Sequence, residues 1–291
     1  MSSANPRTLA RVIQSLPTSD GAGVKLRRSL GAQPGLHVDP FLMLDEFFSD
    51  NPNDYLAGFP AHPHRGFETV TYMLDGHMRH EDHLGNRGDL GPGGVQWMTA
   101  ARGIIHSEMP QQTEGRMRGF QLWINLPSKE KMKPAGYRDI PAGEIPVVRL
   151  QGGGHVKVIA GAFGDTRGPV NGNGVRLSTD PLYLDVHLPG GAEFVAPLTS
   201  GHNAFLYTYE GSAEIGPSGQ AKPLPHRAAG VLSDGGEVRV KASADGVRFL
   251  LLAARPLHEP VVQYGPFVMN TREEIEQALA DYRGGRLTAT A

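Results

Sequence analysis

Short apolar runs with partly alternating polar positions recur along most of the chain and end at glycines and prolines. The 291 residues include 38 glycines and 23 prolines, which separate these runs at close intervals. Runs of this length with a period of two are typical of β-strands. The expected strands are ETVTYML (68–74), GVQWMTA (94–100), GFQLWINL (119–126), HVKVIAG (155–161), PLYLDVHL (181–188), NAFLYTYEG (203–211), EVRVKA (237–242) and VRFLLLAA (247–254). The pattern predicts an all-β protein of sandwiches or barrels rather than alternating β and α units.

One segment near the C-terminus follows a helical pattern instead. The segment TREEIEQALADYRGG (271–285) has acidic residues in its first turn and two glycines at its end. Either Asn270 or Thr271 is a suitable N-cap. We therefore expect one short C-terminal helix on a chain that is otherwise β.

Two segments about half the chain apart resemble copies of one unit. TVTYMLDGHMRH, from Thr69, and NAFLYTYEGSAEIG, from Asn203, each run from a strand with aromatic residues into an acidic residue and a glycine. This spacing is expected of a duplicated domain, although two unrelated hairpins would show the same local pattern. The glycine- and proline-rich segment 134–146 is the expected junction. We predict an N-terminal domain at 1–134 and a C-terminal domain at 135–291 that ends in the helix.

Composition excludes several classes of function. A formal charge of -2, a pI near 6.6 and the lack of any dense run of Lys and Arg argue against nucleic acid and anionic membranes as partners. The absence of cysteine excludes disulfides, thiolate metal sites and iron–sulfur clusters, so any metal needs nitrogen and oxygen ligands. No stretch approaches the roughly 18 apolar residues of a membrane span, and the N-terminus lacks a signal-peptide core. We expect a soluble, cytoplasmic protein.

Histidines gather in the first half of the chain, in two patterns that suit a metal ion. His62 and His64 are one residue apart, and His106 and Glu108 repeat this spacing. Side chains at i and i+2 of an extended segment project from the same face, so each pair can close on one ion. Three nitrogens and one carboxylate leave two positions of a six-coordinate metal for water, dioxygen or substrate, as in open non-haem iron sites.

Other residues in this region have competing assignments. Glu68 is a rival carboxylate, because it keeps the strand parity of His64, but it can also pair with a nearby base or accept a hydrogen bond from a ligand imidazole. His77, His80 and His83 lie among charged and turn residues and are expected to be solvated loop histidines or hydrogen-bonding supports. Trp97, Met98 and Trp123 are expected in the core, with one of them as an alternative pocket wall.

Longer motifs resemble the pirin family, which belongs to the cupin superfamily of small β-barrels. The matching segments are HPHRGFETVTYMLDG (62–76), GVQWMTAARGIIHSEMP (94–110), HVDPFLMLDEF (37–47), FQLWINLPSKEKMKP (120–134) and GPFVMNTREEI (265–275). They cover nearly the whole chain in order, which makes the resemblance very specific. A general cupin motif has a proline before the glycine of G-x-x-H, whereas this chain has Arg102 before Gly103, a departure that pirins share.

The resemblance implies a bicupin, with two cupin-type antiparallel domains and a metal in the N-terminal one. In that family one iron, as Fe(II), is held by the residues that correspond to His62, His64, His106 and Glu108. Glu68 is then expected outside the ligand set. When Gly211 is aligned with Gly76, Pro197 and Thr199 fall where His62 and His64 stand, so the C-terminal domain is expected to be metal-free.

The resemblance also implies two functions. Pirins are similar in site and activity to quercetin 2,3-dioxygenases, which open the central ring of a flavonol with dioxygen and release carbon monoxide; Glu108 would be the catalytic residue. Other pirins are iron-dependent regulators that bind a protein partner, and this alternative stays open. Three imidazoles and a carboxylate also suit manganese, cobalt, nickel, copper and zinc, so iron is the expected metal but not the one that the ligand set requires.

Overall fold

The computed structural model describes residues 5–172 and 177–289, which form two compact units. Unit N consists of residues 16–37, 41–143 and 257–289. Unit C consists of residues 5–15, 38–40, 144–172 and 177–256. Within these described residues there is no helix that is both long enough and apolar enough to cross a membrane.

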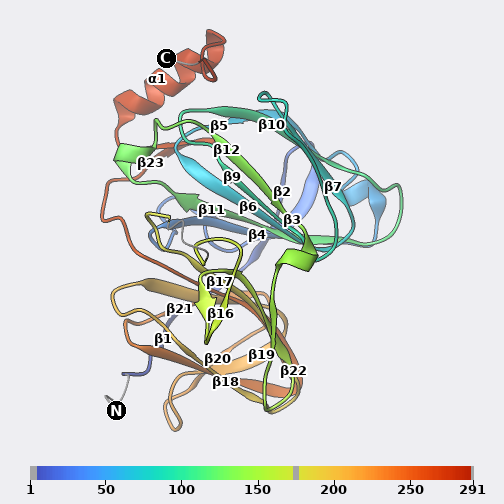
Figure 1. The fold of residues 1–291 in the computed structure, drawn as a ribbon, viewed down its shortest axis with the longest axis vertical. Coiled ribbons are helices and arrows are strands. Elements are labelled where there is room, and N and C mark those ends of the chain that lie inside the picture. The colour runs from blue at the N-terminus through green and yellow to red at the C-terminus, as the bar shows by residue number, and fades with distance from the viewer. Residues whose placement is uncertain (1–4, 173–176, 290–291) are drawn as a thin grey trace. The chain divides into compact units, whose positions relative to one another are not determined.

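Unit N is a sandwich of two antiparallel sheets (Figure 1). The larger sheet contains, in spatial order, β12 (Gly136–Ile140), β9 (Val95–Thr99), β6 (Phe67–Asp75), β11 (Met117–Asn125), β4 (Phe41–Ser49), β3 (Val24–Arg28) and β2 (Leu16–Asp20). The smaller contains β5 (Phe59–His64), β10 (Ile104–Pro110), β7 (Met78–Asp82) and β8 (Arg87–Leu90). A buried cluster that includes Leu26, Phe47 and Met73 of the larger sheet and Met78 and Leu90 of the smaller joins the two.

The C-terminal segment of unit N adds a hairpin and the helix. The hairpin pairs β23 (Val262–Tyr264) with β24 (Phe267–Met269), and α1 (Arg272–Arg283) follows, drawn in red in Figure 1. Thr271 is the N-cap, in a capping box with Glu274, which decides between the two expected caps. Short 3₁₀ turns lie at Pro52–Asp54, Ser128–Glu130 and Ala142–Glu144.

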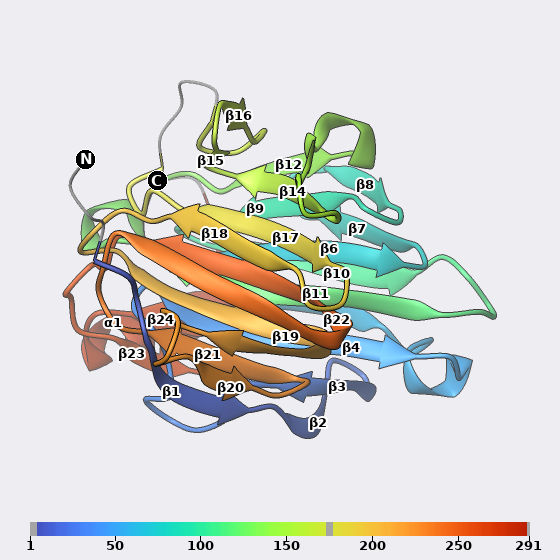
Figure 2. The ribbon, with the colours of Figure 1, turned by 90° about the horizontal axis from the view of Figure 1, so that it is seen from below.

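Unit C is built on one nine-stranded antiparallel sheet. Its order is β1 (Leu9–Gln14), β21 (Ala228–Leu232), β19 (Asn203–Ile215), β22 (Glu237–Ala254), β17 (Leu182–Leu188), β14 (His155–Ala160) and β13 (Val147–Arg149), with β18 (Glu193–Pro197) beside β22 and β20 (Lys222–Leu224) beside β19. A two-stranded ribbon joins β15 (Ala162–Phe163) and β16 (Thr166–Arg167). Figure 2 shows the dark-blue β1 beside the orange strands of this sheet. Buried apolar side chains from these strands form the core of the unit.

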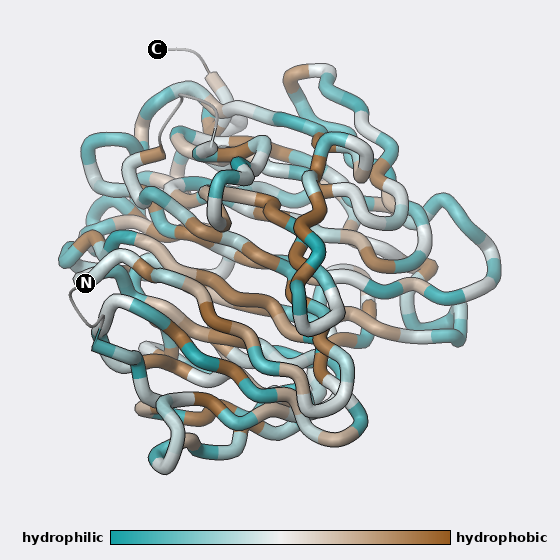
Figure 3. The backbone as a smooth tube through the Cα atoms, turned by 60° about the horizontal axis from the view of Figure 1, so that its bottom comes forward, coloured by the Kyte–Doolittle hydropathy of each residue, from teal (hydrophilic) through white to brown (hydrophobic). Residues whose placement is uncertain are grey.

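The expected strands are confirmed, with one difference. Hydrophobic positions interspersed with paler and hydrophilic ones can be followed along the strands in Figure 3. The two strands expected at 237–242 and 247–254 are one strand, β22, of 18 residues. The first part of β22 pairs with β18 and its second part with β17. Gly246, at a positive φ of 85°, lies between these parts and lets the strand bend without interrupting its hydrogen bonding.

The two ends of the chain belong to different units from those expected. Residues 5–15 lie in unit C and residues 257–289, with α1, lie in unit N, whereas the expected division placed each end with its own half. The expectation assumed contiguous domains. In the structure, β1 pairs with β21, and Arg65 binds the C-terminal segment through Asp281 at 2.9 Å and the carbonyl oxygen of Leu287 at 3.3 Å.

Two glycines of the long motifs are explained by this C-terminal segment. A Cβ at Gly66 would lie 1.9 Å from the carbonyl oxygen of Val268, and a Cβ at Gly103 would lie 2.3 Å from that of Leu287. Both glycines also have positive φ, of 96° and 155°. A larger residue at either position would push the segment away from the strands that carry the histidines.

Candidate metal centre

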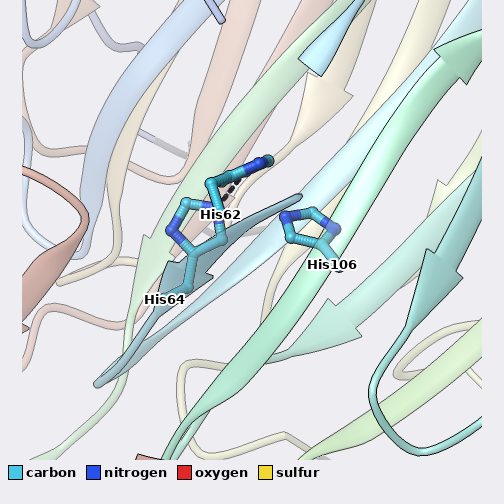
Figure 4. A group of neighbouring side chains, drawn as sticks. All are labelled: His62, His64 and His106. Atoms are coloured by element: carbon cyan, nitrogen blue, oxygen red, sulfur yellow. Dashed lines mark hydrogen bonds between the residues drawn. The ribbon is translucent and has the colours of Figure 1, made fainter. Parts of the chain in front are cut away.

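Two neighbouring strands of the smaller sheet bring three histidines together. β5 carries His62 and His64, and the antiparallel β10 places His106 directly opposite His62. The three side chains converge in Figure 4. One nitrogen from each ring lies within 4.8 Å of the others. The structure therefore brings together three of the four expected ligands.

Local features of β5 permit this arrangement. β5 is an edge strand, so Pro60 and Pro63 interrupt no ladder on its open side. The register shifts between His106 and Glu108, so that Pro60 and Ala61 both oppose one residue of β10. Such a bulge bends a strand and changes where its side chains point.

The imidazole nitrogens have the disposition of ligands to one ion. The Nδ1 of His62 lies 2.8 Å from the carbonyl oxygen of Pro60, so a proton there leaves Nε2 unprotonated. That Nε2 lies 3.1 Å from the Nε2 of His64. Two nitrogens bound to one metal at about 2.1 Å and at a right angle would be roughly 3 Å apart. The Nε2 of His106 is buried without a hydrogen-bond partner among the described residues, as a ligand atom would be. The residues present thus fit a metal.

Burial keeps two of these imidazoles neutral. Desolvation, followed by the nearby His62, holds the pKa of His64 well below its usual range. Desolvation, followed by His64, His62 and His80, does the same for His106. Only the neutral imidazole has a lone pair for a metal, so the site is prepared for a cation without losing protons first.

His80 supports His106 from behind, within the sheet. It is fully buried in β7, and its Nδ1 lies 3.3 Å from the Nδ1 of His106. Its Nε2 lies 3.2 Å from Asp82, whose carboxylate also accepts hydrogen bonds from the backbone of Leu84 and from Asn86. Contact with His80 occupies the Nδ1 of His106 and leaves its Nε2 for a metal.

The structure divides the three histidines at 77, 80 and 83 between the two expected alternatives. His77 and His83 are exposed, as expected. His80 is not a solvated loop residue, because β7 pairs with β10 and buries it; its role as a hydrogen-bonding support fits the alternative. Its neighbours in sequence are charged, and this masked its inward direction.

Glu108 lies in the same region but outside the group of three. Its two carboxylate oxygens accept hydrogen bonds from Thr71 at 2.8 Å and from Gln121 at 3.3 Å. The carboxylate is buried, and Glu108 lines the same cavity as His62 and His64. Its position is compatible with a fourth ligand, and that role stays a prediction.

Glu68 lies on the other sheet, in β6. Its carboxylate accepts a 2.6 Å hydrogen bond from Thr99, and burial raises its pKa. It is not one of the three residues of the histidine group. The structure therefore gives Glu68 a partner on the neighbouring strand β9 rather than a ligand imidazole.

A cavity of about 620 Å³ opens beside the histidines. Its walls are mostly apolar and include Leu26, Met43, Phe47, Phe59 and Trp123, and its polar lining includes Arg28, Asp45 and Gln121 together with His62, His64 and Glu108. Trp97, Met98 and Trp123 are buried, as expected, and Trp123 is also a wall of the cavity. A cavity of this size suits a drug-sized aromatic molecule.

Sequence reasoning missed the residues that hold Glu108. One signal was present for Gln121, which is a polar residue inside the otherwise apolar strand FQLWINL. Thr71 gave none, because threonine is common in strands. Both reach Glu108 only through the packing of the larger sheet against β10.

The chain is similar to known proteins over nearly its whole length. The family model described as pirin matches residues 23–124, and the model described as the pirin C-terminal cupin domain matches residues 183–288. A Pseudomonas aeruginosa protein named "Putative quercetin 2,3-dioxygenase" is 59% identical over 93% of this chain and 94% of its own length. Human pirin is 44% identical over 98% of this chain and 95% of its own length.

A solved structure agrees in fold. The crystal structure of quercetin 2,3-dioxygenase from Acinetobacter baumannii matches with a TM-score of 0.87 and 32% identity, over 97% of this chain and 98% of that one. Together with the two family matches, it confirms the prediction of an all-β chain with two cupin domains.

Proposed function

Because this chain belongs to the pirin family, we propose that it is a metal-dependent dioxygenase of the quercetin 2,3-dioxygenase type. The substrate would be a flavonol, whose central ring is opened with dioxygen and which loses carbon monoxide. Support comes from a relative and a solved structure that carry this name at 59% and 32% identity.

The observation that carries the proposal is the position of the histidine group at an aromatic-walled cavity. His62 and His64 line a space of about 620 Å³ together with Phe59 and Trp123. A flat aromatic substrate can lie against these walls while its polar edge reaches the histidines.

His62, His64, His106 and Glu108 would hold the metal. We propose iron, as Fe(II), with manganese, cobalt, nickel, copper and zinc as other metals that the donor set accepts. When bound, the metal supplies open positions for substrate and dioxygen and the redox chemistry between them.

Glu108 has the second role of proton acceptor. The 3-hydroxyl of a flavonol must lose its proton, and Glu108, whose buried carboxylate lines the same cavity as His62 and His64, is the proposed acceptor. Thr71 and Gln121 fix the plane of this carboxylate through their hydrogen bonds. A carboxylate held in this way reaches the hydroxyl without first losing rotational freedom.

Anaerobic reconstitution with Fe(II), followed by a flavonol and air, tests the proposal. Repeated turnovers with one carbon monoxide released per flavonol consumed are expected. A chain with His62→Ala and His64→Ala, treated in the same way, is the control. Tight iron binding without turnover of any flavonol would overturn the enzyme and favour the regulator that binds a protein partner.

A further inference from the structure

A row of polar side chains crosses the inner face of the larger sheet in unit N. Directly opposed positions on six successive strands are polar: Asp139 (β12), Gln96 (β9), Thr71 (β6), Gln121 (β11), Asp45 (β4) and Arg28 (β3). Opposed residues of antiparallel strands project from the same face. A buried polar group costs free energy unless it is hydrogen-bonded, so an unbroken polar row in a sandwich requires an explanation.

The middle of the row is explained by Glu108, which Thr71 and Gln121 hold. The end of the row at Arg28 has no such explanation. There Arg28 donates to both oxygens of Asp45 at 2.7 Å, and its Nη2 also donates to Asp20 at 2.7 Å. Asp45 is buried, whereas the side chain of Arg28 is 22% exposed and that of Asp20 is 49% exposed.

All three charged residues line the same cavity as the histidines. Arg28 is two strands from Gln121, a separation of roughly 10 Å at the usual strand spacing. Met43, Phe47 and Leu26 supply apolar walls of this cavity. The cavity thus offers a metal centre at one site, a second polar site about two strands further on, and an apolar lining, which matches a rigid aromatic molecule with hydroxyls at both ends.

We propose that Arg28, Asp45 and Asp20 form a substrate subsite that binds a phenolic hydroxyl remote from the metal. This inference rests on the proposed function and names the part of the substrate that the cavity selects. The carboxylate oxygens of Asp20 and Asp45 each keep a lone pair for an incoming O–H. The Nη1 of Arg28 has no hydrogen-bond partner among the described residues. It would donate a hydrogen bond to the oxygen of the incoming hydroxyl.

The charge of the subsite also discriminates between a neutral hydroxyl and a carboxylate on the ligand. One guanidinium faces two carboxylates, which leaves a net charge of −1. A hydroxyl brings no charge and both donates and accepts, so it is bound. An aromatic carboxylate brings a like charge and has no proton to donate, so it is rejected.

A purely structural role would need only the Arg28–Asp45 pair, which ties β3 to β4. Asp20 lies on β2, is half exposed, and its Oδ1 accepts from the backbone of Gly21 at 2.7 Å. Asp20→Asn keeps the Arg28–Asp45 pair while removing one carboxylate charge from the subsite. It therefore separates recognition from folding.

The test compares two flavonols on anaerobic, metal-loaded protein, one with two adjacent hydroxyls on the pendant ring and one with none. The metal-binding edge is the same in both, so the ratio of their Kd values reports the remote subsite. We expect a preference of about tenfold or more for the hydroxylated flavonol, the scale of one hydrogen bond to a charged group. Asp20→Asn and Arg28→Lys should each reduce this ratio severalfold.

Asp89→Asn and Arg79→Lys are matched controls. Their side chains form a 2.8 Å ion pair at the exposed edge between β7 and β8, outside the cavity. These variants should keep the ratio of the unaltered chain. Near-ultraviolet circular dichroism checks that all four variants remain folded; if Asp20→Asn does not fold, the ratio of the two Kd values on the unaltered chain still decides.

The outcomes separate the two proposals. Equal Kd values for two flavonols that are both turned over would overturn the subsite and leave the proposed function in place. If neither flavonol binds, the proposed function is overturned, and metal-free protein titrated with 2-naphthol, naphthalene and 2-naphthoate decides the subsite. A preference for 2-naphthol that depends on Asp20 supports the subsite, and its absence overturns the subsite too.

Discussion

The environment of His80 in the structure could not be read from its neighbours in sequence. His80 is buried between His106 and Asp82, and its ring stacks on Tyr137 with centroids 4.3 Å apart. The contacts from Asp82 to His80 and from His80 to His106 set the tautomer and direction of His106, which we expect to bind the metal. Groups in such positions typically contribute 10–100-fold to metal affinity.

We predict that His80→Gln lowers metal affinity by roughly tenfold to a hundredfold while the fold is retained. The cause is a His106 ring that is free to rotate or to present the wrong tautomer. Competition with a chelator measures the affinity, and the optical spectrum of the cobalt-substituted protein reports the ligand geometry. His77→Gln, at an exposed histidine, is the control; an unchanged affinity and spectrum in His80→Gln would contradict a positioning role.

The two buried glutamates differ in what surrounds them, and their variants should differ as well. Glu108→Gln keeps the shape of the side chain but removes its basicity, so turnover of a flavonol should fall by about 10² or more while some metal is retained. Glu68→Gln should reduce turnover far less. Glu68 accepts its hydrogen bond from Thr99, and both residues lie on the larger sheet rather than on the sheet that carries the histidines. Steady-state kinetics and metal analysis of both variants check this. An inactive Glu68→Gln beside an active Glu108→Gln would exchange the two assignments.

Strand β5 depends on the C-terminal segment for its position. Immediately after His64, the chain pairs with the segment, since the backbone N–H of Val268 donates to Arg65. Lys131 completes this junction: its buried ammonium donates to Gly66 at 2.7 Å, to Asn125 at 2.6 Å and to Val268 at 2.9 Å. A segment from the far end of the chain thus holds the strand that carries two of the expected ligands.

Lys131→Met should reduce the free energy of unfolding by about 2–4 kcal/mol, because three buried oxygen acceptors lose their donor. Urea denaturation measures this. Lys133→Met is the control, since Lys133 forms a partly exposed ion pair with Glu130 and should change stability by less than about 0.5 kcal/mol. Equal stability of both variants would show that the ammonium does not hold the segment.

The same variant carries a pH dependence. Burial lowers the pKa of Lys131 to about 8, below its unfolded value. Below pH 8 both states are protonated, and the cost of burying the charge is fully present. Between about pH 8 and 10 the unfolded state binds more protons, so the contribution of Lys131 to stability rises with pH. The stability deficit of Lys131→Met relative to the unaltered chain should therefore grow across this interval.

In the whole molecule we expect one metal site, which lies in unit N. The apolar cores of the two units consist of side chains other than the histidines expected to bind the metal. His62→Ala or His64→Ala should therefore remove most of the metal and leave the thermal melt cooperative. A chain with all four ligands replaced should contain no metal, because unit C has Pro197 and Thr199 at the aligned positions. Elemental analysis decides; full metal content in either single variant contradicts the site, and metal in the fourfold variant contradicts the metal-free second unit.

Much of the fold and part of the site could be predicted because they depend on local patterns. Alternation along a strand and the cap of a helix are set by neighbours in sequence, so the strands that the pattern predicted and α1 lie close to their expected bounds. The spacing of His62 and His64 also belongs to this class, since i and i+2 share a face whatever the rest of the chain does.

The remaining features depend on which strands become neighbours and in what register. His80 faces His106 only because β7 pairs with β10, and the polar row from Thr71 to Arg28 exists only because four strands align at one level. The assignment of residues 5–15 to unit C and of residues 257–289 to unit N also depends on which segments pair. Pairing of this kind is decided by burial and hydrogen bonding between segments that are distant in sequence, and no local pattern records it.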